Sequence, residues 1–360
     1  MTKRKRDELS DTESDSETFD FSSDEDSDLF PTKISPPPKK RRRVETYIDI
    51  DYKKLTTLDS LIELINDHKD TFNHDIIQLK NILPELKELK SLIGMEDVKK
   101  AIAFQVLFFV QNLGMNDMMH TVIQGPPGCG KTTLAQIVGK MYLKLGFLRN
   151  DKFIIAKRTD LIGEYLGQTA KKTQRMIDKA QGGVLFIDEA YALGANTTNS
   201  DSYSKECLDT LNQNLSEKKA DFVCIIAGYK QDLKRCFFSR NQGLERRFPW
   251  IYDIKKYNEK QLYEIFIKIV IDNGWVCETG SISPEFFKIN NDKFPHFGGS
   301  LETLYAKVKM VHSQRVFGQP IHTKKIINKE DINRGFKLYL DYEQKEEKIN
   351  SRKPPPGMYL

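Results

Sequence analysis

The sequence predicts an α/β fold, a parallel sheet flanked by helices and followed by a small α-helical domain. Three observations support this prediction. A glycine-rich loop at residues 125–132 stands between a short apolar run and a helical pattern. Further short apolar runs alternate with helical patterns as far as residue 254, which is typical of parallel strands buried on both faces. From residue 258 to about residue 342 the pattern is mainly helical.

Composition divides the chain into segments. Residues 7–29 contain eleven acidic residues and no Lys or Arg. Such a segment cannot bury enough apolar surface to become ordered. We therefore expect a disordered acidic and basic tail (1–46), a helical N-terminal extension (47–90), an α/β domain (91–255), a helical lid (256–342) and a flexible C-terminal tail (343–360).

A run of five cations, Lys39 to Arg43, follows three prolines in the first tail. A nuclear import receptor could bind this run, which would place the protein in the nucleus. Contact with nucleic acid or an acidic partner, and a merely solvated tail, are the alternatives. The five cysteines show no Cys-x2-Cys spacing, which favours a reducing, intracellular compartment. No apolar run reaches the roughly 18 residues of a membrane helix, so we expect no membrane partner.

Each element of the predicted fold has its own signal. Apolar residues at 58, 61, 62 and 65 share one helical face, a second helical stretch covers 76–83, and Pro84 can open the next helix. A long apolar helix then runs to about residue 113. The predicted strands are 121–123, 153–156, 184–187, 222–227 and 250–254.

The loop at 125–132 has the residues of a phosphate-binding loop. Its glycines let backbone N–H groups turn towards phosphate oxygens. Lys131 can reach the β and γ phosphates, and Thr132 can bind Mg²⁺. We interpret Cys129 as a small filler or, alternatively, as a thiol whose pKa the helix N-terminus lowers. The predicted nucleotide-binding residues are Gly125, Pro126, Pro127, Gly128, Cys129, Gly130, Lys131, Thr132 and Thr133.

Two carboxylates, Asp188 and Glu189, follow the apolar run 184–187. The carboxyl end of a buried parallel strand is where open α/β sheets bind ligands. Asp188 would hold Mg²⁺ beside Thr132, and Glu189 would polarise the water that attacks the γ phosphate. Because a glutamate in this role makes water the acceptor, the pair predicts hydrolysis of a nucleoside triphosphate.

Several further motifs give the sequence a family resemblance. Gly94-Met95-Glu96-Asp97-Val98-Lys99 followed by the phosphate-binding loop resembles the AAA+ ATPases. The stretches 160–170, 182–191, 227–229 and 241–248 are similar to those of the CbbX/CfxQ and SpoVK branch. The similarity spans about residues 90–340 and extends to CfxQ-like proteins of large DNA viruses.

The resemblance implies a ring, usually a homo-hexamer, that binds ATP at each subunit boundary, and it places Ile93 and Gly94 near adenine. Arg247 would be the arginine finger that reaches a neighbour's γ phosphate, with the adjacent Arg246 as competitor and a surface salt bridge as the alternative role. Tyr165 resembles the aromatic residue of a central-pore loop that contacts a polypeptide substrate. The alternative is that Tyr165 packs on its own domain.

Two positions depart from the family pattern. Tyr229 stands where the family places a small polar first sensor. Leu301 stands where the second sensor is an arginine, and leucine cannot contact phosphate. Lys307, two turns further along the predicted helix, is a candidate substitute.

These observations predict an ATPase that uses Lys131, Glu189 and Arg247 to hydrolyse ATP and remodels or threads a protein substrate. A DNA- or RNA-associated motor or loader, suggested by the cations at 39–43, is one alternative. A slowly hydrolysing, nucleotide-dependent scaffold, suggested by Leu301, is the other. The sequence does not identify the client protein.

Overall fold

The computed structural model describes residues 46–351, apart from 114–116, 166, 195–201, 220 and 242. The acidic segment, the cations Lys39 to Arg43 and the final proline-rich segment lie outside the described residues. The prediction of a nuclear targeting run therefore concerns a part of the chain that the structure does not describe.

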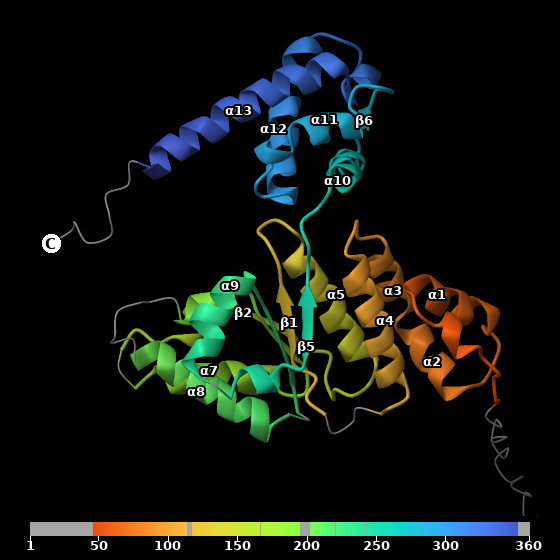
Figure 1. Cartoon of the computed structure of the whole chain (residues 1–360), viewed down its shortest axis with the longest axis vertical. Helices are drawn as coiled ribbons and strands as arrows, with labels where there is room; N and C mark the ends of the chain where they lie inside the picture. The colour runs from red at the N-terminus through yellow and green to blue at the C-terminus, as the bar shows by residue number, and fades with distance from the viewer. Residues whose placement is uncertain are drawn as a thin grey trace, which may run out of the picture. The chain divides into compact units, whose positions relative to one another are not determined.

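A five-stranded parallel sheet forms the centre of the α/β part, with the strand order β2-β3-β4-β1-β5 (Figure 1). In this register Thr121 of β1 lies opposite Ile225 of β4 on one side and Trp250 of β5 on the other. The predicted fold class is confirmed. The strands are β1 (Thr121–Gln124), β2 (Phe153–Ala156), β3 (Val184–Ile187), β4 (Val223–Gly228) and β5 (Trp250–Asp253).

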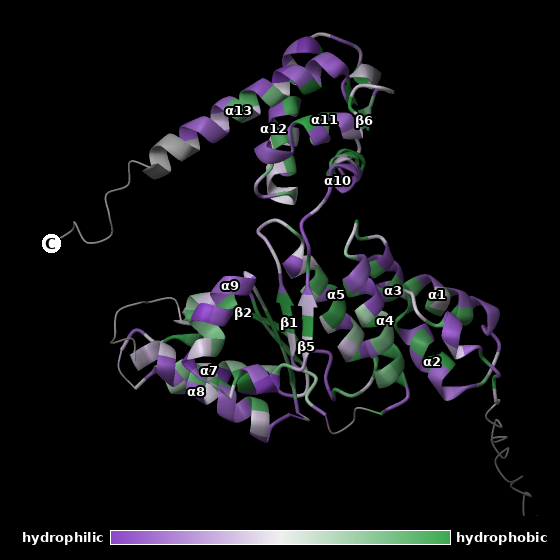
Figure 2. Ribbon diagram, in the orientation of Figure 1, coloured by the Kyte–Doolittle hydropathy of each residue, from purple (hydrophilic) through white to green (hydrophobic). Residues whose placement is uncertain are grey.

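Helices bury both faces of this sheet. α4 (Glu96–Val110) and α5 (Lys131–Lys144) share a core with Ile123 and Phe186. α7 (Thr169–Ala180) and α8 (Ser202–Glu217) share the opposite core with Val122, next to Ile123 in the same strand. Alternate residues thus point into two apolar layers, which explains why these strands read as uninterrupted apolar runs. The hydrophobic colour along β1 in Figure 2 reflects this burial.

The helical extension packs against the α/β part. α1 (Leu58–Asp67), α2 (His74–Asn81) and α3 (Leu83–Lys90) bury Leu61, Ile65 and Leu86 in the same core as α4 and α5. The Lys144 ammonium of α5 lies 2.7 Å from the buried Glu85 carboxylate of α3. The extension is therefore part of the core that supports the sheet.

The C-terminal part is mainly helical. It consists of α10 (Glu259–Asp272), α11 (Pro284–Ile289), α12 (Gly298–Arg315) and α13 (Lys329–Ser351), with a small parallel pair formed by β6 (Val276–Cys277) and β7 (Ile326–Ile327). Strands of two residues are too short to show an alternating pattern, so the sequence prediction contained only helices here. Within the described ranges, no helix is long and apolar enough to cross a membrane.

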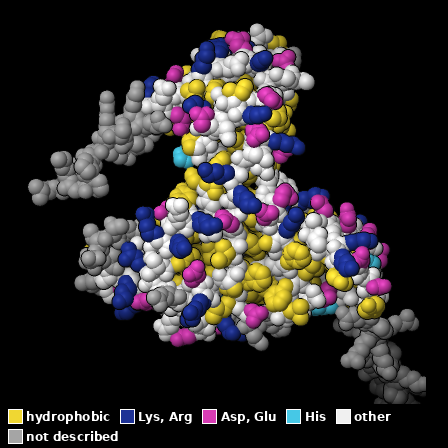
Figure 3. All heavy atoms as spheres, viewed as in Figure 1, with side chains coloured by type: hydrophobic (Ala, Val, Ile, Leu, Met, Phe, Trp, Pro, Cys, Tyr) yellow, Lys and Arg dark blue, Asp and Glu magenta, His cyan; other side chains and the backbone are white. Residues whose placement is uncertain are grey.

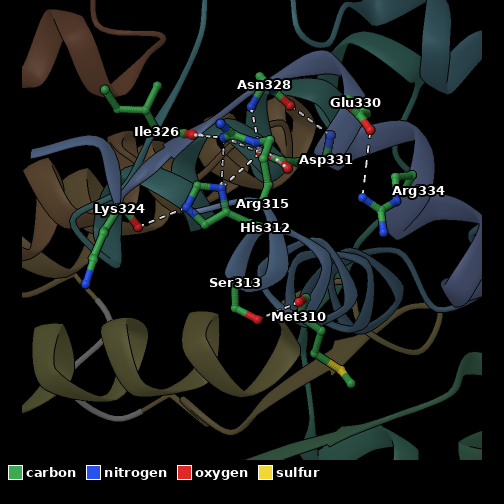
Figure 4. Close-up of polar contacts among 10 residues, drawn as sticks. All are labelled: Met310, His312, Ser313, Arg315, Lys324, Ile326, Asn328, Glu330, Asp331 and Arg334. Carbon is green, nitrogen blue, oxygen red and sulfur yellow. Dashed lines mark hydrogen bonds and ion pairs between the residues drawn. The ribbon is translucent and has the colours of Figure 1, made fainter. Parts of the chain in front are cut away.

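A buried polar network ties this helical part together (Figure 4). The Asp331 carboxylate of α13 accepts hydrogen bonds from Arg315 Nη2 at 2.8 Å and from the Asn328 backbone N–H at 3.0 Å. His312 Nδ1 lies 2.9 Å from the same carboxylate, and its Nε2 lies 2.9 Å from the Lys324 carbonyl oxygen. Burial by itself raises the pKa of Asp331, but hydrogen bonds from Arg315, His312 and the Asn328 N–H outweigh burial and lower it.

Short segments connect the longer elements. η2 (Ala190–Gly194) follows β3, while α9 (Lys230–Asp232) and the π-helical turn η3 (Leu233–Phe237) follow β4. α6 (Arg158–Leu161) precedes α7. The remaining ones are η1 (Tyr52–Lys54), η4 (Phe238–Arg240), η5 (Glu245–Arg247), η6 (Asn291–Lys293) and η7 (Ile321–Thr323).

Candidate nucleotide-binding site

The glycine-rich loop runs from the end of β1 to the start of α5. Gly128 and Gly130 have φ angles of +66° and +83°, a region that favours glycine. A Cβ atom on Gly128 would also lie 1.9 Å from the carbonyl oxygen of His296. The Gly298 N–H, at the start of α12, donates a hydrogen bond to the Gly128 carbonyl oxygen at 3.1 Å. The backbone of the helical lid therefore contacts the loop directly.

The structure brings Thr132 and Asp188 together. The Thr132 hydroxyl, in the first turn of α5, donates a hydrogen bond of 2.7 Å to Asp188 Oδ2 at the end of β3. The residues are far apart in sequence and meet because the carboxyl ends of neighbouring parallel strands lie at one edge of the sheet. A hydroxyl beside a carboxylate is a set of oxygen donors that suits Mg²⁺.

Lys131 lies inside the loop that precedes it. Its ammonium donates hydrogen bonds to the carbonyl oxygens of Pro126 at 2.7 Å and Gly125 at 3.2 Å. It also lies 4.7 Å from the centre of the Tyr229 ring. Burial lowers the pKa of Lys131, and the neighbouring Cys129, Asp188 and Glu189 oppose that change.

Glu189 follows Asp188 with a φ of +50°, which is uncommon for a residue with a side chain. Its backbone N–H donates a hydrogen bond to Asp188 Oδ1 at 3.0 Å. Both carboxylates line the cavity that contains Lys131 and Thr132. The predicted catalytic and metal-binding groups of one subunit, Lys131, Thr132, Asp188 and Glu189, are therefore together.

The cavity has a volume of about 510 Å³, within the size range of small-molecule sites. Its lining includes the loop residues 127–133 together with Asp188 and Glu189. It also includes apolar and aromatic side chains, which suit a base: Leu92, Ile93, Met95, Tyr257, Ile265 and Ile269. Ile93 is one of these residues and Gly94 is not, and the position of either residue near adenine stays a prediction.

Cys129 is a buried filler. Its side chain is inaccessible, and its backbone carbonyl oxygen accepts a hydrogen bond of 3.0 Å from the Tyr257 hydroxyl. Burial raises the pKa of the Cys129 thiol. The alternative interpretation, a thiol with a lowered pKa, is wrong because burial outweighs the nearby Lys131 charge and backbone N–H groups.

The two arginines predicted for the neighbour's site lie away from this cavity. Arg247 is half-buried, and its guanidinium donates hydrogen bonds to Ser216 Oγ at 2.9 Å and to the Gly243 carbonyl oxygen at 2.8 Å. Arg246 is exposed. An arginine finger acts on another subunit, so the role of Arg247 stays a prediction.

Tyr165 lies in the segment between α6 and α7, and 67 % of its side chain is exposed. The alternative in which Tyr165 packs on its own domain is therefore wrong. Its exposure leaves it free for contact with another molecule.

Of two lid lysines, Lys268 lines the cavity and Lys307 does not. Leu301 is fully buried in the lid core. Lys307, the candidate second sensor, lies 4.3 Å from the centre of the Tyr342 ring of α13 and is not among the residues that line the cavity. Lys268 of α10 does line the cavity, and its ammonium donates a hydrogen bond of 3.0 Å to the Ser91 carbonyl oxygen.

Sequence reasoning missed Lys268 and Tyr191. Lys268 is one charged residue in an ordinary helical pattern, so no local signal marks it. Tyr191 follows Glu189 closely and lines the cavity together with Tyr229. Its position two residues after the acidic pair was a signal that could have been used.

The parallel sheet, the phosphate-binding loop and the acidic pair together define a P-loop ATPase. The family described as "ATPase family associated with various cellular activities (AAA)" matches residues 121–247. A putative cfxQ-like protein, R730, of Acanthamoeba polyphaga mimivirus is 42 % identical over 289 residues, which cover 78 % of this chain and 71 % of the viral protein. The chain belongs to the AAA family of ATPases, on its CfxQ-like branch.

Other relatives agree with this assignment. The CfxQ homolog of Galdieria sulphuraria is 30 % identical over 76 % of this chain and 89 % of its own length. The stage V sporulation protein K of Bacillus subtilis is 38 % identical over 52 % of this chain, and the match spans 61 % of that protein. The crystal structure of the FIGL-1 AAA domain in complex with ADP shares the fold, with a TM-score of 0.51 at 19 % identity over 72 % of this chain and 89 % of that one.

Proposed function

We propose that this chain binds ATP with Mg²⁺ in the cavity described above, hydrolyses it to ADP and phosphate, and uses the cycle to remodel or thread a protein substrate as a ring oligomer. The observation that carries the proposal is the hydrogen bond between Thr132 and Asp188, with Glu189 and Lys131 beside it. Membership of the AAA family supports ATP hydrolysis.

The residues present fit this chemistry. Thr132 and Asp188 would hold Mg²⁺, which supplies charge neutralisation at the phosphate oxygens. Lys131, already inside the loop, would bind the β and γ phosphates as a point charge. Glu189 would accept a hydrogen bond from the attacking water and orient it. The Gly298 N–H keeps the lid next to the loop, so that lid movement can accompany nucleotide binding.

An exposed apolar face supports association between copies of the chain. Figure 3 shows hydrophobic side chains gathered over α4 and the edge strand β5. Phe104 and Leu113 are 55 % and 63 % exposed, and Ile251 of β5 is 49 % exposed. Apolar patches of this kind often mark protein interfaces. The Ile251→Asp variant should reduce the ATP-dependent increase in mass by light scattering, whereas Ile251→Val should keep it.

The exposed Tyr165 supports a protein substrate. A Tyr165→Ala variant should keep its basal ATPase activity and lose stimulation by a reduced and alkylated protein that stays unfolded. Tyr47→Ala removes another exposed tyrosine, one that lies outside the α6–α7 segment, and should keep full stimulation. Equal stimulation of both variants would contradict the role of Tyr165.

Glu189→Gln tests the hydrolytic step. The variant should bind ATP with unchanged affinity in calorimetry and should hydrolyse it about 100-fold more slowly or worse. Glu264→Gln changes an exposed glutamate of α10 and serves as the control. Unchanged turnover in Glu189→Gln would contradict the proposed role of Glu189 in ATP hydrolysis, and with it the proposed function.

A slowly hydrolysing scaffold is the second candidate, because Leu301 is buried in the lid and Lys307 faces α13. A scaffold should bind partners in the ATP state and show no stimulation by an unfolded protein. The remaining alternative, a DNA- or RNA-associated motor or loader, depends on residues 39–43. Deletion of residues 1–46 should abolish DNA-stimulated ATPase activity if that alternative is correct.

A further inference from the structure

Two tyrosines face each other at the edge of the cavity. Tyr191 lies in η2, shortly after the acidic pair that ends β3, and Tyr229 directly follows β4. Their rings stack with centroids 5.2 Å apart and an interplanar angle of 22°. Since β3 and β4 are neighbouring parallel strands, both rings lie at the edge of the sheet where Asp188 and Glu189 emerge.

The surrounding backbone fixes this stack. A Cβ atom on Gly228 would lie 2.9 Å from Cδ1 of Tyr191, so the absence of a side chain at Gly228 makes room for the ring. The segment that carries Tyr191 is held at two carbonyl oxygens. Arg158 Nη1 donates a hydrogen bond to the Ala192 carbonyl oxygen, and Arg240 Nη2 donates one to that of Gly194 at 3.0 Å. The position of the Tyr191 ring is thus set by the fold.

Each ring contacts one of the charges that hydrolysis requires. The Lys131 ammonium lies 4.7 Å from the centre of the Tyr229 ring, within the range of a cation–π interaction. Tyr191 lines the same cavity as Glu189 and lies two residues further along the chain. Burial, followed by the negative charge of Glu189, raises the pKa of Tyr191, so its hydroxyl stays protonated and is available as a donor beside that carboxylate.

We propose that Tyr191 and Tyr229 are positioning residues for ATP hydrolysis: the Tyr191 hydroxyl orients the Glu189 carboxylate, and the Tyr229 ring holds the Lys131 ammonium. Because the two rings are stacked, a displacement of Lys131 would move Tyr229, then Tyr191, and so change the orientation of Glu189. This inference rests on the proposed function, because it takes Glu189 to be the group that orients the attacking water.

The two tyrosines are expected to respond differently to loss of the hydroxyl. Tyr191→Phe keeps the stacked ring and removes the donor, and kcat should fall about tenfold or more with the Kd for ATP unchanged. Tyr229→Phe keeps the ring over Lys131, so its loss in kcat/KM should be smaller than that of Tyr229→Leu. Tyr229→Leu removes the ring, and kcat/KM should fall about fivefold or more.

The control is Tyr263→Phe, a half-buried lid tyrosine that packs edge-on against Phe287 and should leave all constants unchanged. Thermal unfolding of each variant separates a folding defect from a kinetic one. A Tyr191→Phe variant with wild-type kcat would overturn the inference. So would Tyr229→Leu with wild-type kcat/KM.

A double variant distinguishes this inference from the proposed function. In single-turnover experiments, Tyr191→Phe should cause no further loss when it is added to Glu189→Gln, because the hydroxyl acts through that carboxylate. A further tenfold loss in that background would mean that Tyr191 acts elsewhere and would overturn the inference alone. If Glu189→Gln by itself keeps full turnover, the proposed function fails instead.

Discussion

Asp331→Asn is expected to destabilise the helical lid. The Asp331 side chain is 1 % exposed, and it accepts hydrogen bonds from Arg315, His312 and the Asn328 N–H. An asparagine has no charge to offer the Arg315 guanidinium, and its own N–H group would face one of the donors. Breaking a buried ion pair costs about 3–5 kcal/mol. Because the Arg315 side chain is 31 % exposed and water can solvate it, we expect a loss of about 2–3 kcal/mol in the free energy of unfolding.

The lid contains its own spectroscopic reporter. The chain has two tryptophans. Trp275 packs edge-on against the His312 ring with centroids 4.9 Å apart, whereas Trp250 lies in β5. In a Trp250→Phe background, denaturant titration followed by Trp275 fluorescence therefore measures the stability of the lid. Asp341→Asn changes an exposed carboxylate on the same helix and serves as the matched control.

The difference in unfolding free energy between wild type and Asp331→Asn should depend on pH in a defined direction. The pKa of Asp331 is lowered in the folded state. Its charge therefore stabilises the lid above the unfolded pKa of about 3.9, and this stabilisation is lost as the pH falls through the folded pKa. The stability difference between wild type and Asp331→Asn should be full at pH 5–6 and shrink below about pH 4. A difference of less than about 1 kcal/mol at pH 6, or one that grows in acid, would refute the reasoning.

Three further predictions concern other parts of the chain. Gly128→Ala places a Cβ atom 1.9 Å from the His296 carbonyl oxygen, so the Kd for ATP should rise at least about tenfold in calorimetry; unchanged affinity would show that the lid yields. Gly139→Ala meets the Phe153 ring at 2.1 Å and should cost about 1–3 kcal/mol in denaturant unfolding. We also propose nuclear import through residues 39–43. A fluorescent reporter fused to residues 33–46 should enter the nucleus, and a reporter that stays cytoplasmic would disprove this.

The parts of the site that the sequence predicted depend on local patterns. A glycine-rich loop between an apolar strand and a helix fixes where Lys131 and Thr132 lie. The apolar run before Asp188 identifies a buried strand, and parallel strands end at one edge of the sheet. The contact between Thr132 and Asp188 follows from these two facts, although 56 positions separate the residues.

The parts that sequence reasoning missed depend on contacts between distant segments. Lys307 was a reasonable substitute for an arginine on helical spacing alone, but its side chain faces Tyr342 of α13. Nothing local to α12 indicates where α13 lies. For the same reason the contact of His312 in α12 with Asp331 in α13 could not be predicted from the sequence.

The contact between Gly298 and Gly128 is made by main-chain atoms alone. Alanine at position 298 would leave that donor in place, but its Cβ atom would lie 2.9 Å from the same Gly128 carbonyl oxygen, so the two segments would have to move apart. Proline is the one standard residue that lacks the donor, and the first position of a helix tolerates it. Gly298→Pro would add the same Cβ atom and also remove the donor, so the difference between Gly298→Ala and Gly298→Pro isolates what the hydrogen bond between lid and loop contributes.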